Sequence, residues 1–578
     1  MIVETLVSLA LLALFPLPAA AMAHAARGRG RSLVDVLDSV ALGYAVSWCA
    51  LYVLSAWSLW LFTALWLAGL VAAVAIGLRR LVPSAAPLAP PAPKDGPWTG
   101  ARRALAVVLA LAGLVRVLPA LYRELPPGWD SYFHLVVADR IATLHARIAD
   151  LAPYEAITLN YPLGSHLLVA WIADLGGVPV HAVFKLALVW LGTLTCAQVF
   201  ALATAATGDE EAGVYAAGAI GLLAALGGFD YYRWGGLPNL AGMYLFLALL
   251  TRLAVRPREG ALTRALAAGV LFVAIALVHH HVMIVAGLCL AVCAAHAWWS
   301  GRERPLARDI AAGLAAAAVL GAPYFVAYLG RARGLGRTGI GGFEEPLTNL
   351  VADVGEIGLV FTFAAVMGAL FAGGGPARRA LGGLVAPSLV TLLVVYVALK
   401  HGVAAVALLL GGRPLALFTP SRFLTDAVPL LAVFAGLFFA ETRHRLGATP
   451  ARTLAVIVLA FPLGLPLYGR LFSDEVGPVA RAAYAWVRQH AEPTAGLVDS
   501  RIHGTYLARR ASSAMPLPIS EYVEDARNLK TLQAIAAGAR PASDFGRVYV
   551  ISRGSEFQHL GGREVWRDPS GLRILKLE

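Results

Sequence analysis

The segment "ELPPGWDSYFHLVVADRI", from Glu124 to Ile141, decides the fold. It directly follows an apolar run of roughly 18 residues, which is long enough to cross the hydrocarbon core of a bilayer as a helix. An aspartate, a histidine and three aromatic side chains therefore stand where that helix leaves the membrane. Polar groups are costly beside lipid and are kept mainly where they are used, so this segment is the first candidate for a functional site.

The composition excludes an ordinary soluble protein. The 578 residues are 59% hydrophobic and only 14% charged, with a mean hydropathy of +0.70, whereas a soluble chain of this length needs far more surface charge. Long apolar runs recur along most of the chain, and helices are the expected spanning form because lipid offers no water to satisfy backbone groups. The sequence predicts an all-α polytopic membrane bundle of about 14 transmembrane helices.

The cysteines and the net charge point to no disulfide framework, zinc site or nucleic-acid partner. The net charge is +12, but the arginines lie mostly in short loops, where they orient a protein in the bilayer. The four cysteines all fall inside apolar runs and are typical of small buried residues. They are Cys49, Cys196, Cys289 and Cys293.

The distribution of arginine predicts the topology. Three arginines follow the apolar run at 2–24, which favours a retained helix with its N-terminus outside over a cleaved signal peptide. A Pro/Ala-rich linker at 79–103 is assigned to the cytoplasm by its basic residues. Further spans are predicted near 34–55, 57–77, 104–121, 178–207, 213–228, 237–255, 261–278, 282–299, 309–329, 355–373, 380–398, 421–441 and 450–469.

On this topology nearly all the unusual polar chemistry lies on the outer side, and we expect no charge deep within the spans. The tail from about Ser473 changes character: "VARAAYAWVRQHA" has the spacing of an amphipathic helix, and "GLVDS", "RVYVIS" and "LRILKL" are typical of short strands. The sequence therefore predicts a small C-terminal mixed α/β domain, also on the outer side. We expect a multi-pass protein of a prokaryotic plasma membrane.

Asp130 and His134 lie four residues apart, so on a helix they share one face. A carboxylate and an imidazole at the outer membrane boundary can hold a divalent cation or accept a proton from a nucleophile. The alternative is an N-cap aspartate beside an interfacial histidine within an aromatic belt.

The segment "GWDSYFHLVVADRI", with "NYPLGSHLLVAWIADLGG" twenty residues later, resembles the first outer loop of the GT-C glycosyltransferases. The similarity is greatest to the catalytic subunit of oligosaccharyltransferase and its prokaryotic relatives, and it extends loosely from about residue 104 to the C-terminus. It implies a polyprenyl-phosphate or polyprenyl-diphosphate sugar donor, transfer on the outer face, and a catalytic divalent cation such as Mg or Mn held with the help of Asp130. The matching positions are Asp130, Tyr132, Phe133, His134, Tyr161, Pro162 and Gly164.

The resemblance also divides the chain. Residues 1–78 are predicted as additional N-terminal transmembrane helices and 79–103 as the cytoplasmic linker. Residues 104–470 are predicted as a GT-C-like transmembrane catalytic domain with an outer loop at 122–177, and 471–578 as the extracytoplasmic α/β domain.

"GGFDYYRWGGLPN", at 227–239, is predicted as a second loop of the site. Asp230 lies where the resembling families place a second acidic motif, so it is a candidate catalytic acid and metal ligand, with Arg233 on the donor phosphate. The usual Asp-x-Asp form is missing, because Tyr231 and Tyr232 follow Asp230. The alternative is an interfacial turn with a local Asp–Arg pair.

Arg422, in "TPSRFLTDAVPLL", opens a late span at its outer end. Resembling enzymes use an arginine in a comparable span on the lipid-linked phosphate, and we predict that role here. Snorkelling of the guanidinium to the headgroups is the alternative, and Asp426, one turn inward, is a competing partner for Arg422.

Two more polar groups are candidates. The three consecutive histidines of "LVHHHVMIV" point about 100° apart on a helix, so they cannot all ligate one ion. One of them, His280 or His281, is a candidate to face the site. The alternative is that the histidines form a simple turn at the membrane interface. The resemblance implies an acidic residue from an outer loop near the acceptor, and Glu345 or Glu344 is the candidate. Tyr132 and Tyr161 complete the candidate acceptor or loop residues.

The tail departs from the resembling family. The Trp-Trp-Asp-Tyr-Gly motif that grips the acceptor there is replaced by "VDSRIHGTYL", so we do not expect the usual Asn-x-Ser/Thr acceptor but a lipid, a glycan or another protein site. The sequence thus predicts a membrane glycosyltransferase. The rival from another class is a transporter or flippase of lipid-linked intermediates, which would place polar residues near the bilayer midplane on broken helices.

Overall fold

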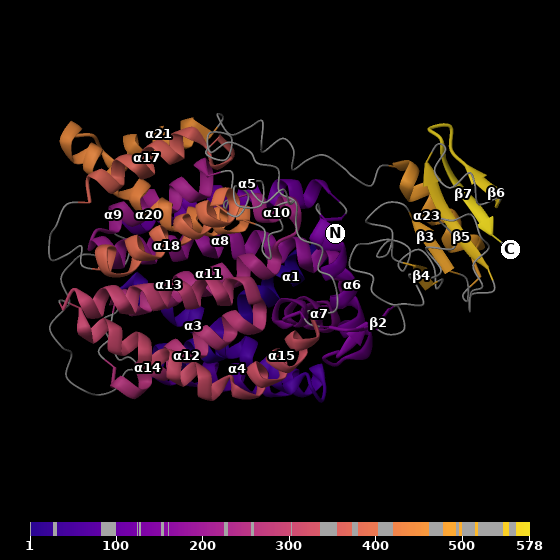
Figure 1. Cartoon of the computed structure of the whole chain (residues 1–578), viewed down its shortest axis with the longest axis horizontal. Coiled ribbons are helices and arrows are strands. Elements are labelled where there is room, and N and C mark those ends of the chain that lie inside the picture. The colour runs from indigo at the N-terminus through magenta and orange to yellow at the C-terminus, as the bar shows by residue number, and fades with distance from the viewer. Residues whose placement is uncertain are drawn as a thin grey trace.

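The computed structural model shows a large helical bundle and, at one end of the long axis, a small domain built on a sheet (Figure 1). The described residues are 2–26, 32–81, 100–123, 125–126, 129–151, 155–159, 161–224, 229–255, 259–301, 303–335, 355–372, 380–402, 420–461, 478–492, 496–499, 515–517, 547–553 and 562–577.

The bundle confirms the predicted polytopic helical membrane protein. Within the described ranges nine helices are long and apolar enough to cross a membrane, and α14 (Arg304–Leu320) with α15 (Ala322–Leu335), bent by 71°, makes a tenth if the pair is one span. The count of 14 stays a prediction. The other bundle helices are α1 (Ile2–Leu14), α2 (Leu17–Ala26), α3 (Leu33–Leu54), α4 (Leu59–Leu81), α5 (Gly100–Tyr122), α6 (Trp129–Leu144), α7 (Gly164–Gly176), α8 (Val180–Thr207), α9 (Glu210–Gly218), α10 (Asp230–Trp234), α11 (Leu237–Val255), α12 (Ala261–Val278), α13 (His280–Trp299), α17 (Leu359–Leu370), α18 (Ala386–Val397), α20 (Pro420–Leu446) and α21 (Pro450–Ala460).

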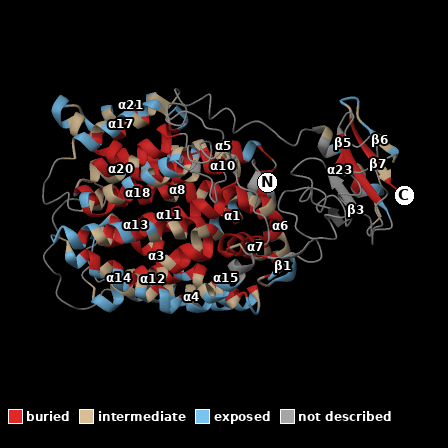
Figure 2. Cartoon of the chain, in the orientation of Figure 1, coloured by how far each residue is buried: buried red, intermediate tan, exposed pale blue. Residues whose placement is uncertain are grey.

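Helices α8, α11 and α20 form the centre of the bundle. They are buried along most of their length, whereas α4, α14 and α17 expose apolar side chains at the periphery (Figure 2). A helix that is apolar on all sides is stable only when other helices or lipid surround it, which fits both groups. Among the described residues three π-helical turns interrupt the α-helical geometry, at Ala219–Leu223, Leu381–Val385 and Ala398–Gly402.

The N-terminal helices are packed into the bundle. Helix α3 contacts α7, α8, α11 and α12, and it begins with a capping box between Ser32 and Asp35. The hydroxyl of Tyr44 on α3 donates to the carbonyl oxygen of Leu12 on α1 at 2.7 Å and accepts from the indole N–H of Trp190 on α8 at 2.6 Å. One buried tyrosine therefore ties three helices together.

The outer loop between α5 and α8 contains α6, a short hairpin of β1 (Asp150–Leu151) and β2 (Glu155–Thr158), and α7. Gly164, the glycine of "NYPLG", begins α7 directly against the C-terminal end of α12, where an added Cβ would lie 2.8 Å from the carbonyl oxygen of Leu277. Only glycine permits this approach, which brings α7 beside the histidines that follow α12.

The C-terminal domain has a five-stranded sheet in the order β4-β3-β5-β7-β6, which confirms the predicted small mixed α/β region. Strands β4, β3 and β5 are parallel, and β7 and β6 are antiparallel additions. Helix α23 (Pro478–His490) covers the sheet, with Tyr484 and Val487 packed against Tyr549 and Ile574. The strands are β3 (Gly496–Asp499), β4 (Met515–Leu517), β5 (Val548–Arg553), β6 (Arg563–Arg567) and β7 (Leu572–Leu577).

Candidate active site

Polar side chains from distant parts of the sequence meet at one end of the bundle. Helices α6, α7 and α10 lie at the end nearest the C-terminal domain (Figure 1). The start of α13 and the first turns of α20 contribute to the same region through the contacts described below. We call this group the outer cluster, defined as Asp230, Arg233, Trp234, Arg422, Asp426 and the residues that they contact.

Asp230 begins the short helix α10 and is buried. One carboxylate oxygen forms an ion pair with Arg233 at 2.7 Å, and the other accepts a hydrogen bond from the indole of Trp234 at 3.0 Å. Burial raises the pKa of Asp230, while the Arg233 guanidinium and the Trp234 hydrogen bond oppose that rise. The local Asp–Arg pair, which was the alternative from sequence, is therefore present.

Gly235 ends α10 with φ at +82°, a conformation that few residues other than glycine adopt readily. A Cβ at this position would overlap the backbone and hydroxyl of Ser131 in the first turn of α6. The two acidic segments identified from sequence, which contain Asp130 and Asp230, are therefore packed against each other through a glycine.

Arg422 lies at the start of α20 with its guanidinium carbon 5.1 Å from the centre of the Trp234 ring. This cation–π contact joins α20 to α10, and the same indole is bonded to Asp230. The positive charge of Arg422 also acts on His134 and His280. Trp234, which the sequence analysis did not select, is the link between the predicted phosphate-binding arginine and the predicted second acid.

Asp426 is fully buried one turn inward from Arg422. One of its oxygens accepts from Asn239 on α11 at 2.9 Å and from the hydroxyl of Tyr231 on α10 at 3.2 Å, and the other lies 3.0 Å from Nε2 of His281 on α13. Side chains from three helices therefore satisfy this carboxylate. Among the described contacts Asp426 makes no ion pair with Arg422, so the competition considered from sequence is not observed.

A group of imidazoles from α6, α7 and the start of α13 lies close enough to Arg422 for its charge to act on His134, His279 and His280. Nδ1 of His134 on α6 is 2.9 Å from Nε2 of His166 on α7, and the ring of Tyr161 contacts both, as well as His279 and His280. Burial lowers the pKa of His166 to about 3, and burial with the neighbouring His166 and Arg422 holds the pKa of His134 well below its usual range. Both imidazoles are therefore neutral at physiological pH.

Several predicted residues fall where side chains are not described. Asp130 and Tyr132 lie in the first turn of α6, one turn or less from His134, but their side chains are outside the described set. Glu344 and Glu345 are outside the described residues altogether. The roles predicted for these four residues stay predictions.

The metal ligands proposed from sequence are not assembled by the described side chains. Within that part of the chain no three His, Cys, Asp or Glu side chains are placed to hold a metal ion. Both carboxylate oxygens of Asp230 are occupied by Arg233 and Trp234, and Nδ1 of His134 is occupied by His166. The divalent cation therefore stays a prediction that depends on Asp130.

One expectation from sequence is wrong. Arg116 lies well inside the predicted span of α5 and is buried, although no deep charge was expected. Its Nη1 donates to the carbonyl oxygens of Ala112 at 3.0 Å and Gly221 at 3.1 Å, and its guanidinium carbon lies 4.7 Å from the centre of the Phe229 ring. A π-helical turn leaves carbonyl groups without their regular partners, and Gly221 lies in such a turn, so protein groups compensate this charge.

Comparison with known families identifies the chain only in part. A model of a family of unknown function, DUF6541, matches residues 12–398. The chain belongs to this family. No curated protein sequence matches it.

Solved structures identify the fold of this family member. ArnT from Cupriavidus metallidurans bound to undecaprenyl phosphate is 13% identical with a TM-score of 0.54, and the match covers 82% of this chain and 97% of ArnT. The apo oligosaccharyltransferase of Archaeoglobus fulgidus is 11% identical with a TM-score of 0.54, and the match covers 78% of this chain and 69% of that protein. The archaeal oligosaccharyltransferase AglB from the same organism, with an inhibitory peptide and dolichol-phosphate, is 13% identical with a TM-score of 0.50, covering 77% and 69%. The chain has a GT-C-like membrane glycosyltransferase fold.

Proposed function

We propose that this protein is an integral-membrane glycosyltransferase that moves a sugar or glycan from a polyprenyl-phosphate or polyprenyl-diphosphate carrier to an acceptor on the extracytoplasmic face. One observation carries the proposal. In a GT-C-like fold, Arg422 lies over the indole of Trp234, whose N–H is bonded to Asp230, so a cation and a carboxylate from separate helices are fixed at one site. The solved relatives that bind undecaprenyl phosphate and dolichol-phosphate support the carrier class.

The chemistry of glycosyl transfer assigns the roles. The bond between the anomeric carbon and the carrier phosphate breaks as the acceptor attacks, so negative charge develops on the phosphate. Arg422 binds that phosphate, with Arg233 beside it. Asp130 orients the acceptor and receives its proton, and a glutamate at 344 or 345 lies near the acceptor. Asp230 holds Arg233 and Trp234 in place through the contacts described above.

The acceptor in this proposal is not the Asn-x-Ser/Thr sequon, because "VDSRIHGTYL" replaces the expected motif in the C-terminal domain. A lipid, a glycan or another protein site is proposed instead. The neutral imidazole of His134 and the carboxylate of Asp130 would hold a divalent cation, Mg or Mn, which would offset phosphate charge. No step above depends on that ion.

Purified protein in liposomes tests the proposal directly. Fluorescent or radiolabelled polyprenyl-phosphate sugars are supplied with candidate acceptors, with and without EDTA. We expect transfer by the wild type and its loss in Asp130→Asn, with unchanged thermal unfolding in detergent. An Asp130→Ala protein that transfers sugar at the wild-type rate would rule out the role of Asp130.

The second candidate is a flippase of lipid-linked intermediates, and the deep charge of Arg116 beside a π-helical turn is the observation in its favour. The same liposomes separate the two. Movement of a labelled carrier lipid between leaflets without any sugar transfer would favour the flippase, whereas transfer to an acceptor without such movement favours the enzyme.

A further inference from the structure

We propose that the N-terminal helices α1–α4 position the candidate active site, and that Trp171 of α7 is the residue through which they act. The inference rests on the proposed function, because the group that these helices would hold in place is the segment of α6 with Asp130. Trp171 is a positioning residue, which acts through His166 and His134 and not on the substrate directly.

Trp171 is fully buried against the N-terminal helices. Its indole N–H donates to the hydroxyl oxygen of Thr63 on α4 at 2.9 Å. Its ring packs edge-on against Phe62 and Trp66 of the same helix, with ring centres 5.4 Å and 5.1 Å away. The ring of Phe15, which directly follows α1, lies 5.5 Å away. Aromatic pairs add to the energy of burial and a buried indole needs an acceptor, so these contacts fix the position of α7.

The other side of α7 faces the candidate site. His166 lies five residues before Trp171, so the two side chains point about 140° apart around the helix. Nε2 of His166 is 2.9 Å from Nδ1 of His134 on α6, and Asp130 lies one turn before His134. A shift or tilt of α7 would therefore move His134 and with it the first turns of α6.

The end of α6 is anchored to the same N-terminal helices. At the corner between α3 and α4, the N–H of Leu59 donates to the carbonyl oxygen of His145 at 2.7 Å. The N–H of Arg147 donates to the carbonyl oxygen of Ser55, also at 2.7 Å. His145 has φ at +52°, and its Nδ1 lies 3.0 Å from Asp174 on α7. A non-glycine residue keeps such a strained conformation only where its surroundings fix it, so this corner is a second anchor.

Other contacts tie the N-terminal helices to the centre of the bundle. Trp190 on α8 donates to Tyr44 on α3 at 2.6 Å, and Arg252 on α11 pairs with Asp38 on α3 at 2.7 Å. Because α3 is fixed to α8 and α11 by these contacts, the contacts of Trp171 are not needed to keep the N-terminal helices in the bundle. They determine where α7 lies.

Transfer kinetics of the purified full-length protein test the inference. Trp171→Phe keeps a buried ring but loses the N–H donor to Thr63, so α7 should shift. We expect kcat to fall about 10-fold to 100-fold, because a small misplacement of a catalytic group slows the reaction by that order. KM for the polyprenyl-phosphate sugar should stay unchanged, because the proposed function assigns the carrier phosphate to Arg422.

Thr63 offers a second variant at the same contact. Thr63→Val should lower kcat as Trp171→Phe does, whereas Thr63→Ser, which keeps the hydroxyl, should retain the wild-type kcat. Wild-type kcat in both Trp171→Phe and Thr63→Val would overturn the inference.

Trp190→Phe is the matched control. It also removes an indole N–H that donates to a hydroxyl of the N-terminal helices, but the indole is on α8 and not on α7. We expect a fall in the thermal unfolding midpoint similar to that of Trp171→Phe, with an unchanged kcat. An equal fall in kcat in the two variants would overturn the inference, because the rate would then depend on the packing of these helices in general.

Amide hydrogen exchange separates a failure of the inference from a failure of the proposed function. In Trp171→Phe, exchange should become faster in α6 as well as in α7, while α11 and α20 exchange at the wild-type rate. Faster exchange in α6 of a protein that transfers no sugar would support the coupling and refute only the enzyme. Unchanged exchange in α6 would overturn the inference, whatever the activity.

Discussion

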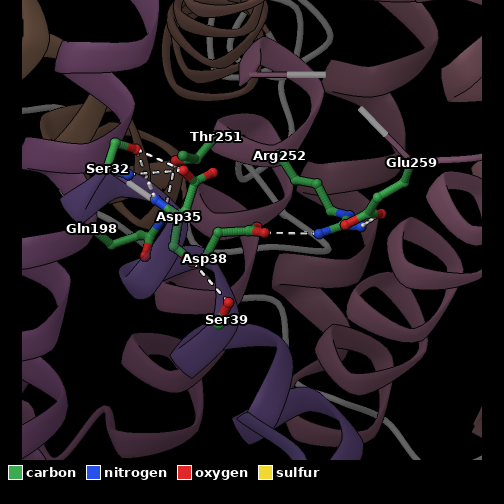
Figure 3. Close-up of polar contacts among 8 residues, drawn as sticks. All are labelled: Ser32, Asp35, Asp38, Ser39, Gln198, Thr251, Arg252 and Glu259. Atoms are coloured by element: carbon green, nitrogen blue, oxygen red, sulfur yellow. Dashed lines mark hydrogen bonds and ion pairs between the residues drawn. The ribbon is translucent and has the colours of Figure 1, made fainter. Parts of the chain in front are cut away.

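Helix α11 connects two polar clusters of opposite character. Near its start, Asn239 donates to Asp426 in the outer cluster. Near its end, Arg252 forms ion pairs with Asp38 on α3 and with Glu259 before α12, a group that we call the inner cluster (Figure 3). Thirteen residues of helix place the two clusters roughly 20 Å apart. The comparison shows how one bundle uses buried charge for two purposes.

The inner cluster consists of ion pairs between one arginine and two carboxylates. Arg252 is buried, its Nη1 lies 2.7 Å from Asp38, and its Nη2 pairs with Glu259. The nearby Gln198–Thr251 hydrogen bond of 2.9 Å joins α8 to α11 in the same region (Figure 3). A cation held by two carboxylates has no reason to attract a ligand, so the inner cluster fixes α3 to the bundle core.

The outer cluster distributes charge differently. Asp426 is held by Asn239, Tyr231 and His281, and Arg422 lies over an indole ring rather than replacing one of these groups. An aromatic ring holds a guanidinium in place without neutralising it, which suits the role proposed for Arg422 on the carrier phosphate. The inner cluster consists of one arginine between two carboxylates, whereas the outer cluster combines the Asp230–Arg233 ion pair with a cation–π contact and a hydrogen-bonded carboxylate. The difference teaches that buried charge can serve packing in one part of a bundle and a candidate binding site in another.

The largest expected effect is on stability at the inner cluster. Arg252→Ala removes the partner of Asp38, which is buried, and of Glu259, which is partly buried, and removing one member of a buried ion pair costs about 3–5 kcal/mol. We expect a large fall in the thermal unfolding midpoint in detergent, with normal transfer by the protein that stays folded.

The double variant Asp38→Asn with Arg252→Met is the control, because it removes charges of both signs together. Most of the lost stability should return. If Arg252→Ala instead lowered kcat at unchanged stability, the two clusters would not differ in kind.

The next effect is on activity at the outer cluster. Arg422→Ala should lower kcat/KM for transfer by about 100-fold to 1000-fold, because it removes one group that stabilises the departing phosphate. The thermal midpoint should change little, since the arginine is partly exposed. Arg422→Lys keeps the charge but loses the planar stacking group, so its kcat/KM should lie between those of the wild type and Arg422→Ala. A large loss of stability with unchanged kcat/KM would reverse the assignment.

The sequence predicted the secondary-structure elements better than it predicted which side chains contact one another. The apolar runs gave the helices, and the short spacing of Asp230 and Arg233 was enough to anticipate their ion pair. The contacts of Asp426 were missed because its partners lie as far as 195 residues away, and Arg252 lies 214 residues from Asp38. Helical periodicity shows which face of a helix is apolar, but not which helix packs against it. Trp234 and His166 were missed for the same reason.

The smallest predicted effect tests the link between α10 and α20. Tyr231→Phe removes one hydroxyl from Asp426 and leaves Asn239 and His281 in place, so stability should fall by about 1 kcal/mol. Because Tyr231 adjoins Asp230, the loosened α10 should also raise KM for the donor severalfold. Tyr44→Phe, which removes a buried hydroxyl that ties α1, α3 and α8, is the matched control. It should cost similar stability without changing KM, and a KM shift of equal size in both variants would show that the outer cluster responds to packing in general rather than to its own geometry.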